Sequence, residues 1–206
     1  MVRARIRSST KVAVATQPDL AAAMMPPPHS MLQNPLAYIA AEHGGQRALC
    51  NLIENFAGTP DFDHEVARVI LRYLGRDFSR HVRDEESDLF PILRERCLPE
   101  DEIEIVLARL HAEHRDEHRL AGGVEYELTT LVGRKKPMLD FALRERLFQY
   151  ARSLRRHLAL ENSVVLPLAR ARMTQADLAK LSTAMRNRLQ ASAGSGSSAA
   201  PEQRWS

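Results

Sequence analysis

The sequence of 206 residues has few cysteines, few aromatic side chains and no long apolar stretch. Its two cysteines, without a continuous apolar segment near the N-terminus, argue against a secreted disulfide scaffold. No stretch approaches the roughly 18 apolar residues that a membrane-spanning helix needs. These absences exclude the classes of secreted disulfide-rich and integral membrane proteins. We therefore expect a cytoplasmic protein that does not bind a membrane.

A strong charge of one sign is also lacking. The formal net charge is +3, and the first 33 residues account for it. Their charged side chains are Arg3, Arg5, Arg7, Lys11 and Asp19. The central part of the chain is neutral and offers no basic face, so we expect no nucleic-acid partner.

Aromatic residues make up 5% of the chain and apolar residues rarely alternate with polar ones, which predicts an all-α fold. Four long helical patterns are expected, followed by a short fifth helix. Their approximate ranges are Pro35 to Gly58, Pro60 (after an N-cap at Thr59) to the residue before Pro99, Pro99 to Gly133, Leu139 to Met173, and Thr174 to Leu189. Long helices with short connections predict an up-down-up-down four-helix bundle over residues 34–190. Residues 1–33 and 191–206 are expected to be a disordered arm and a disordered tail.

An internal repeat links the second and fourth helical patterns. "HVRDEESDLFP" at residues 81–91 is matched 76 residues later by "HLALENSVVLP". In both, a glutamate follows the histidine by four residues and a proline, Pro91 or Pro167, follows the glutamate by six. A second echo is "AEH", at residues 41–43 and 112–114. The chain is therefore expected to contain two αα-hairpins, each with a His on its first helix and a His and a Glu on its second.

These histidines and glutamates fall on the apolar stripes of their helices. A buried carboxylate must be paired, protonated or bound to a cation, because burying its charge alone costs several kcal/mol, about 3–5 when a partner is removed. Residues four apart on a helix are neighbours, so a His and a Glu at that spacing can serve one metal site. The candidate ligands are His43, His81, Glu85, His114, His157 and Glu161. Buried His–Glu hydrogen bonds without a metal are the alternative.

The donor types narrow the choice of metal. Imidazole with carboxylate suits iron, manganese or zinc. Four imidazoles and two carboxylates exceed the needs of one tetrahedral zinc ion and suit two metals bridged by the carboxylates. Two further side chains lie near the candidate ligands in the sequence. Asp77 could orient the ring of His81 or be an exposed acid, and His111 is expected on a solvated face.

The motifs "AEH", "HVRDEESDLFP", "EH" and "HLALENSVVLP" resemble those of hemerythrin-like proteins, in particular the HHE cation-binding domain. The resemblance covers about residues 34–173. It implies a non-heme centre of two iron ions with histidine terminal ligands and carboxylate bridges. It also implies action on O₂, NO or peroxide, or the handling of iron.

The sequence departs from the oxygen-carrying members of that family. They have H-x4-D on the last helix, where this chain has H-x3-E, and two histidines spaced H-x3-H on the third helix. Here His114 and His118 offer that spacing. With His118 the centre resembles the carriers. Without it, the centre resembles the iron–sulfur cluster repair proteins of the same superfamily.

We therefore expect a protein that binds or senses O₂, NO or redox state, with His118 as a tentative ligand. Two alternatives stay open. One is an iron donor or iron–sulfur cluster repair protein acting under nitrosative or oxidative stress. The other is a zinc-bound or metal-free helical interaction module. Whether the protein is an enzyme stays open as well.

Overall fold

The computed structural model describes residues 25–195, which form helices joined by short connections and contain no strand. The all-α prediction is confirmed. Helix α2 spans Pro35–Gly58, the range that the sequence predicts. The Asn34 side chain caps it by accepting a hydrogen bond from the backbone N–H of Ala37, and proline at the first helical position has its φ preset for a helix.

The second helical stretch begins later than predicted. Helix α3 spans His64–Arg72, and its N-cap is Asp63, whose carboxylate accepts two backbone N–H groups of the first turn. The prediction of Thr59 as N-cap and Pro60 as first helical residue is wrong. The Thr59 hydroxyl donates instead to the carbonyl of Phe56, at the end of α2.

Three wider, π-helical segments interrupt the second and fourth helical stretches. The elements in order are α3, the π segment Tyr73–Phe78, α4 (Ser79–Asp84), the π segment Glu85–Leu89 and α5 (Phe90–Arg96); then α7 (Phe141–Leu160), the π segment Glu161–Val165 and α8 (Leu166–Arg172). The last two π segments begin at the two candidate carboxylate ligands and end two residues before Pro91 or Pro167. In an α-helix a proline ring clashes with the carbonyl four residues earlier, and a wider turn relieves that clash.

The third and fifth helices differ from their predicted bounds. Helix α6 spans Ile103–Val132, and Pro99–Asp101 form a separate 3-10 turn before it. Glu102, with a φ of 48°, lies between the two and prevents one continuous helix. Helix α9, Gln175–Ser195, is longer than predicted. The predicted cap is confirmed, because the Thr174 hydroxyl accepts a hydrogen bond from the backbone N–H three residues later.

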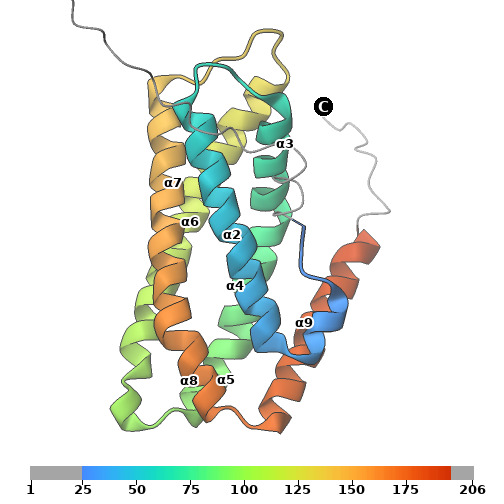
Figure 1. Cartoon of the computed structure of the whole chain (residues 1–206), viewed down its shortest axis with the longest axis vertical. Helices are drawn as coiled ribbons and strands as arrows, with labels where there is room; N and C mark the ends of the chain where they lie inside the picture. The colour runs from blue at the N-terminus through green and yellow to red at the C-terminus, as the bar shows by residue number, and fades with distance from the viewer. Residues whose placement is uncertain (1–24, 196–206) are drawn as a thin grey trace, which may run out of the picture.

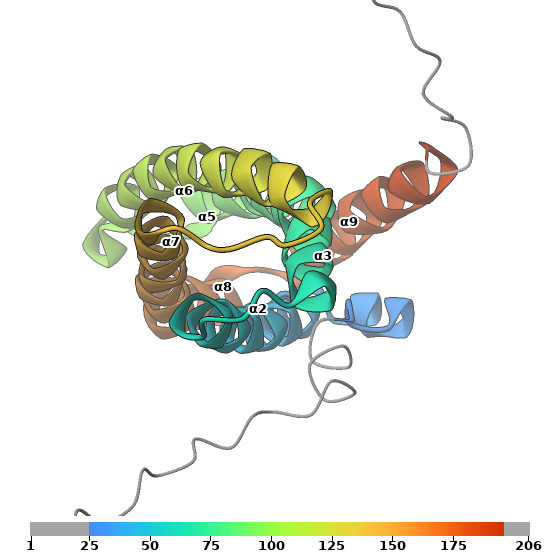
Figure 2. The ribbon, with the colours of Figure 1, turned by 90° about the horizontal axis from the view of Figure 1, so that it is seen from above.

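The long helices run side by side along the long axis of the molecule (Figure 1) and surround a common interior when seen from above (Figure 2). Helix α7 packs against both α2 and α6, and α3 packs against α2 and α6. Helix α9 lies outside this group and packs on α2, α4 and the short 3-10 helix His29–Gln33. Among the described helices, none is long and apolar enough to cross a membrane.

Two apolar clusters fill the interior, and the candidate ligands lie between them along the helices. The upper core, in the orientation of Figure 1, includes Ile53, Leu128 and Leu147, all fully buried. The lower core includes Ile39 and Leu107, also fully buried. The layer of histidines and glutamates is therefore separated from water by apolar side chains above and below.

The segments that flank the predicted bundle are partly ordered. Within the expected arm, His29–Gln33 form a 3-10 helix, and the Leu32 side chain is fully buried in the lower core. Its carbonyl accepts a 2.6 Å hydrogen bond from the Ser182 hydroxyl of α9, which explains why this segment is held in place. Within the expected tail, α9 continues to Ser195. Residues 1–24 and 196–206, the rest of the expected arm and tail, lie outside the described residues.

Candidate metal centre

Six of the predicted ligands meet in one buried layer. Each of the four long helical stretches contributes one imidazole. The π segments Glu85–Leu89 and Glu161–Val165 each contribute a carboxylate at their first residue. The six side chains, all at most 4% exposed, are His43 of α2, His81 of α4, His114 of α6, His157 of α7, Glu85 and Glu161. The rigid helices fix these side chains relative to one another before any metal binds.

The Glu85 carboxylate lies among three imidazoles. Its Oε1 is 3.2 Å from Nε2 of His81 and 3.6 Å from Nε2 of His43. Its Oε2 is 3.3 Å from Nε2 of His114. The two oxygens of one carboxylate therefore face imidazoles on opposite sides, which is the arrangement of a bridging ligand.

The Glu161 carboxylate has a matching position on the other hairpin. Its Oε2 is 3.2 Å from Nε2 of His157 and 3.3 Å from Nε2 of His43. The Nε2 atoms of His114 and His157 are themselves only 3.2 Å apart. Two ring nitrogens that close together need a proton or a cation between them.

These side chains form two overlapping sets of possible metal ligands. One set is His43, His81, Glu85 and Glu161, and the other is Glu85, His114, His157 and Glu161. Within each set the donor atoms lie within 4.8 Å of one another, and both carboxylates belong to both sets. The arrangement fits two cations that share two carboxylates.

Unsatisfied polar atoms support the fit to a metal. Nε2 of His43 and His81, Oε2 of Glu85 and both oxygens of Glu161 are buried without a hydrogen-bond partner among the described residues. Leaving buried donors and acceptors unpaired costs about 1–3 kcal/mol each. Cations coordinated by these atoms would satisfy them all, and the nitrogen and oxygen donor set suits iron, manganese or zinc.

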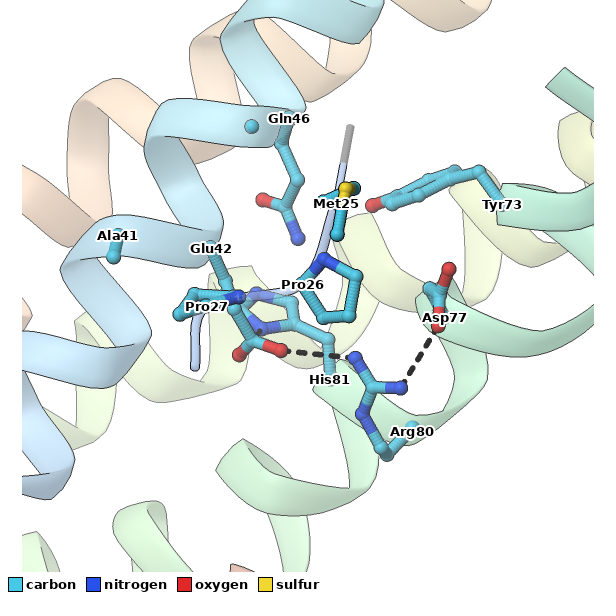
Figure 3. Close-up of a pocket in the computed structure, with 11 residues that line it drawn as sticks. Met25, Pro26, Pro27, Ala41, Glu42, Gln46, Tyr73, Asp77, Arg80 and His81 are labelled. Carbon is cyan, nitrogen blue, oxygen red and sulfur yellow. Dashed lines mark hydrogen bonds and ion pairs between the residues drawn. The ribbon is translucent and has the colours of Figure 1, made fainter. Parts of the chain in front are cut away.

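The outer nitrogen of His81 is held by a residue that the sequence analysis did not single out. Nδ1 of His81 donates to Oε2 of Glu42 over 3.2 Å, which turns Nε2 toward the centre, where a metal could displace its proton. Arg80 in turn donates to Glu42 over 3.0 Å and to Asp77 over 2.8 Å (Figure 3). Asp77 therefore accepts a hydrogen bond from Arg80, and it is Glu42, not Asp77, that orients the His81 ring.

The other three imidazoles also have outer partners. Nδ1 of His114 donates to Glu86 over 2.8 Å, Nδ1 of His43 donates to Asn162 over 3.3 Å, and Nδ1 of His157 lies 3.3 Å from Oε2 of Glu113. The repeat contained this signal. The glutamate of each "AEH" motif contacts the second histidine of its own hairpin: Glu42 contacts His81 and Glu113 contacts His157. The residue that follows Glu85 or Glu161 contacts the first histidine of the other hairpin.

His111 and His118 are both absent from the two ligand sets. His111 lies on the solvated face that the sequence predicts, and its partly exposed ring, 28% accessible, donates to Glu86 over 2.8 Å. His118 is exposed, and its ring lies 4.6 Å from that of Phe78, centre to centre. The structure does not bring His118 to the centre, because the buried stripe of α6 passes through Glu117 instead.

The electrostatics of the layer favour positive charge. Burial alone raises the pKa of Glu85, but His81, His114 and His43 outweigh burial and hold that pKa well below its ordinary value. Burial lowers the pKa of His81, but Glu85 and Glu42 raise it to about 9. The pKa values of His114 and His157 are raised as well, so without a metal, protons on these three imidazoles supply the positive charge. Metal ions would displace these protons, so binding should release protons.

Comparison with known proteins agrees with this geometry. No curated protein matches the chain closely enough to be compared with it. The model of the hemerythrin HHE cation-binding domain matches residues 34–169, which include all six ligand positions of the two sets. The chain belongs to the hemerythrin HHE cation-binding family.

Proposed function

We propose that the protein is a non-heme di-iron protein that binds or senses O₂, NO or redox state. The observation that carries the proposal is the sharing of both carboxylates, Glu85 and Glu161, by two sets of imidazoles. An iron pair would supply the binding of a diatomic gas and the transfer of electrons to it. The chain would hold both ions at fixed positions, keep the imidazole lone pairs inward and exclude water by means of the two cores.

The proposal includes the scaffold and its setting. We propose an up-down-up-down order of the four long helical stretches, supported by the contacts of α2 with α3 and of α6 with α7, which succeed each other along the chain. We also propose a cytoplasmic protein whose ligand is a small gas rather than a nucleic acid or a membrane. The neutral central part of the sequence supports this choice.

The exposed position of His118 supports sensing over reversible oxygen transport. Four imidazoles and two carboxylates would not fill the coordination of two irons, so O₂ is expected to oxidise the pair rather than be held reversibly. Stopped-flow mixing of the reduced protein with O₂ and with NO tests this. A stable oxygenated spectrum that reverts on removal of O₂ would contradict it.

Metal analysis tests the binuclear centre. Protein purified under iron-replete conditions should contain about two irons per chain, since each ligand set fits one cation. Glu85→Ala should lower the content toward zero, because Glu85 belongs to both sets, whereas His81→Ala should remove one iron. One zinc per chain, or equal losses in the two variants, would argue against two carboxylate-bridged irons.

An iron donor or iron–sulfur cluster repair protein is the second candidate. Without His118, the sequence resembles the iron–sulfur cluster repair proteins, which have four histidines and two glutamates at the centre. The exposed position of His118 favours this composition. Transfer of iron from the loaded protein to a metal-free iron–sulfur protein would support this candidate. Retention of both irons in that mixture would favour sensing.

A further inference from the structure

Glu117 is a buried carboxylate that the two ligand sets do not include. It lies on the buried stripe of α6 and is 0% exposed. Neither of its oxygens forms a hydrogen bond of normal geometry with a described residue. A buried charge without a partner is strongly unfavourable, so such a side chain must be neutral or lie beside a cation.

The direction of the helices places Glu117 on the side of the imidazole layer opposite to the bridging carboxylates. Helix α6 runs from the lower core, at Leu107, to the upper core, at Val124, so Glu117 lies above His114. The stretches that carry Glu85 and Glu161 run from the upper core to the lower core, so each glutamate lies below its own histidine. The upper side of the centre would otherwise lack a carboxylate.

The charges around Glu117 connect it to one half of the centre. Burial raises its pKa, while His157, His114 and the Ser153 hydroxyl lower it and Glu161 raises it. Its strongest charged neighbours are therefore the two imidazoles of one ligand set. The Ser153 hydroxyl is a hydrogen-bonding neighbour, but neither carboxylate oxygen has a partner of ordinary geometry, so the side chain can turn toward a cation bound there.

We propose that Glu117 is a third carboxylate ligand of the centre, binding from the upper side the metal held by His114 and His157. This inference rests on the proposed pair of metals. It makes Glu117, rather than His118, the second ligand that α6 contributes. It also makes the two metal positions chemically different.

The corresponding position of the first hairpin holds an amide. Gln46 follows His43 by three residues, as Glu117 follows His114, and it is buried with Oε1 unpaired. Figure 3 shows its amide group directed toward a pocket that Tyr73, Asp77 and His81 also line. The amide faces this pocket rather than the ligand set, so the metal held by His43 and His81 would have no third carboxylate and should be the more weakly bound of the two.

Anaerobic titration with Fe(II) against a competing chelator tests the inference. Glu117→Gln should weaken the tighter of the two binding steps by at least about 10-fold. It should not lower the melting temperature of the metal-free protein, because both oxygens of the carboxyl group that it replaces lack a partner of ordinary geometry. Asp116→Asn, a change at the exposed neighbouring residue, is the control and should alter neither quantity.

Unchanged Fe(II) affinity in Glu117→Gln would overturn the inference. If the metal-free variant also melted at a lower temperature, Glu117 would have a structural role instead. If Glu117→Gln does not fold, Glu117→Asp, which keeps a carboxylate on a shorter side chain, carries the test: it should weaken the tighter binding step, and unchanged affinity would count against the inference. A wild-type protein that binds fewer than two Fe(II) ions would instead refute the proposed function.

Discussion

Each imidazole of the centre is oriented at its outer nitrogen by a side chain that does not face the metal positions. For His81 and His157 these side chains are Glu42 and Glu113, each the residue before a histidine ligand. A carboxylate at the outer nitrogen selects the ring tautomer with a free inner lone pair and makes that lone pair more basic. Metal affinity is therefore expected to depend on residues beyond the ligands themselves.

Replacement of Glu42 tests this dependence. Glu42→Gln should weaken Fe(II) binding by about 10- to 100-fold, because the amide orients and polarises the His81 ring less than the carboxylate does. The measurement is chelator competition on the folded variant. Asp77→Asn is the matched control, since it weakens the contacts of Asp77 with Arg80 at 2.8 Å and Arg76 at 3.4 Å and leaves Glu42 on His81. Equal weakening in both variants would contradict an orienting role for Glu42.

At the scale of elements, α9 is attached to the bundle by both apolar packing and charge. Leu181 and Met185 are fully buried in the lower core. Near the start of α9, Asp177 accepts hydrogen bonds from Arg96 at 2.8 and 3.0 Å and from the Thr174 hydroxyl at 2.7 Å. These contacts connect the end of α5 to the beginning of α9.

The Asp177 contacts should make this attachment sensitive to acid. Hydrogen bonds from Arg96 and Thr174 hold the pKa of Asp177 well below its ordinary value of 3.8. Because the folded pKa is the lower one, the stabilisation is fully present above pH 3.8 and is lost as the pH falls through the depressed pKa. Asp177→Asn should therefore melt at a lower temperature than wild type at pH 7.

Melting curves of the wild type and the variant between pH 7 and pH 2 would show this. The difference in melting temperature should narrow in strong acid, whereas Asp116→Asn should stay close to wild type throughout. A difference that is independent of pH would mean that the Asp177 charge does not contribute to the attachment.

For the whole molecule, metal binding and folding are expected to be coupled. The layer of imidazoles and carboxylates lies between two apolar cores, so without metal it is a set of buried polar atoms that are partly unsatisfied. A ligand that binds only the folded state stabilises it by about 2.7 kcal/mol at 100 times its dissociation constant. In a domain of this size, that corresponds to roughly 5–11 °C in melting temperature.

Calorimetry before and after removal of metal by a chelator is the measurement. The melting temperature should fall on chelation and return when Fe(II) is restored under anaerobic conditions. Identical melting temperatures with and without metal would indicate that His–Glu pairs alone satisfy the layer.

The sequence by itself determined the helical class and the candidate ligands that repeat. Helical periodicity and the spacing of four between His81 and Glu85, and again between His157 and Glu161, are local properties of the chain. The repeat then made it improbable that their positions were accidental. This is why all six side chains of the two sets could be named without coordinates.

Only the tertiary structure decided which neighbours of these residues take part. Around the helix axis, the residues three and four positions after His114 lie on either side of it. The sequence therefore permits either Glu117 or His118 to face inward. Packing of α6 on α3 and α7 turns Glu117 inward and leaves His118 exposed. The pairing of Glu42 with His81, 39 residues apart, likewise depends on how two helices meet. Periodicity fixes a residue's angle around its own helix, but only contacts with other helices fix which angle is buried.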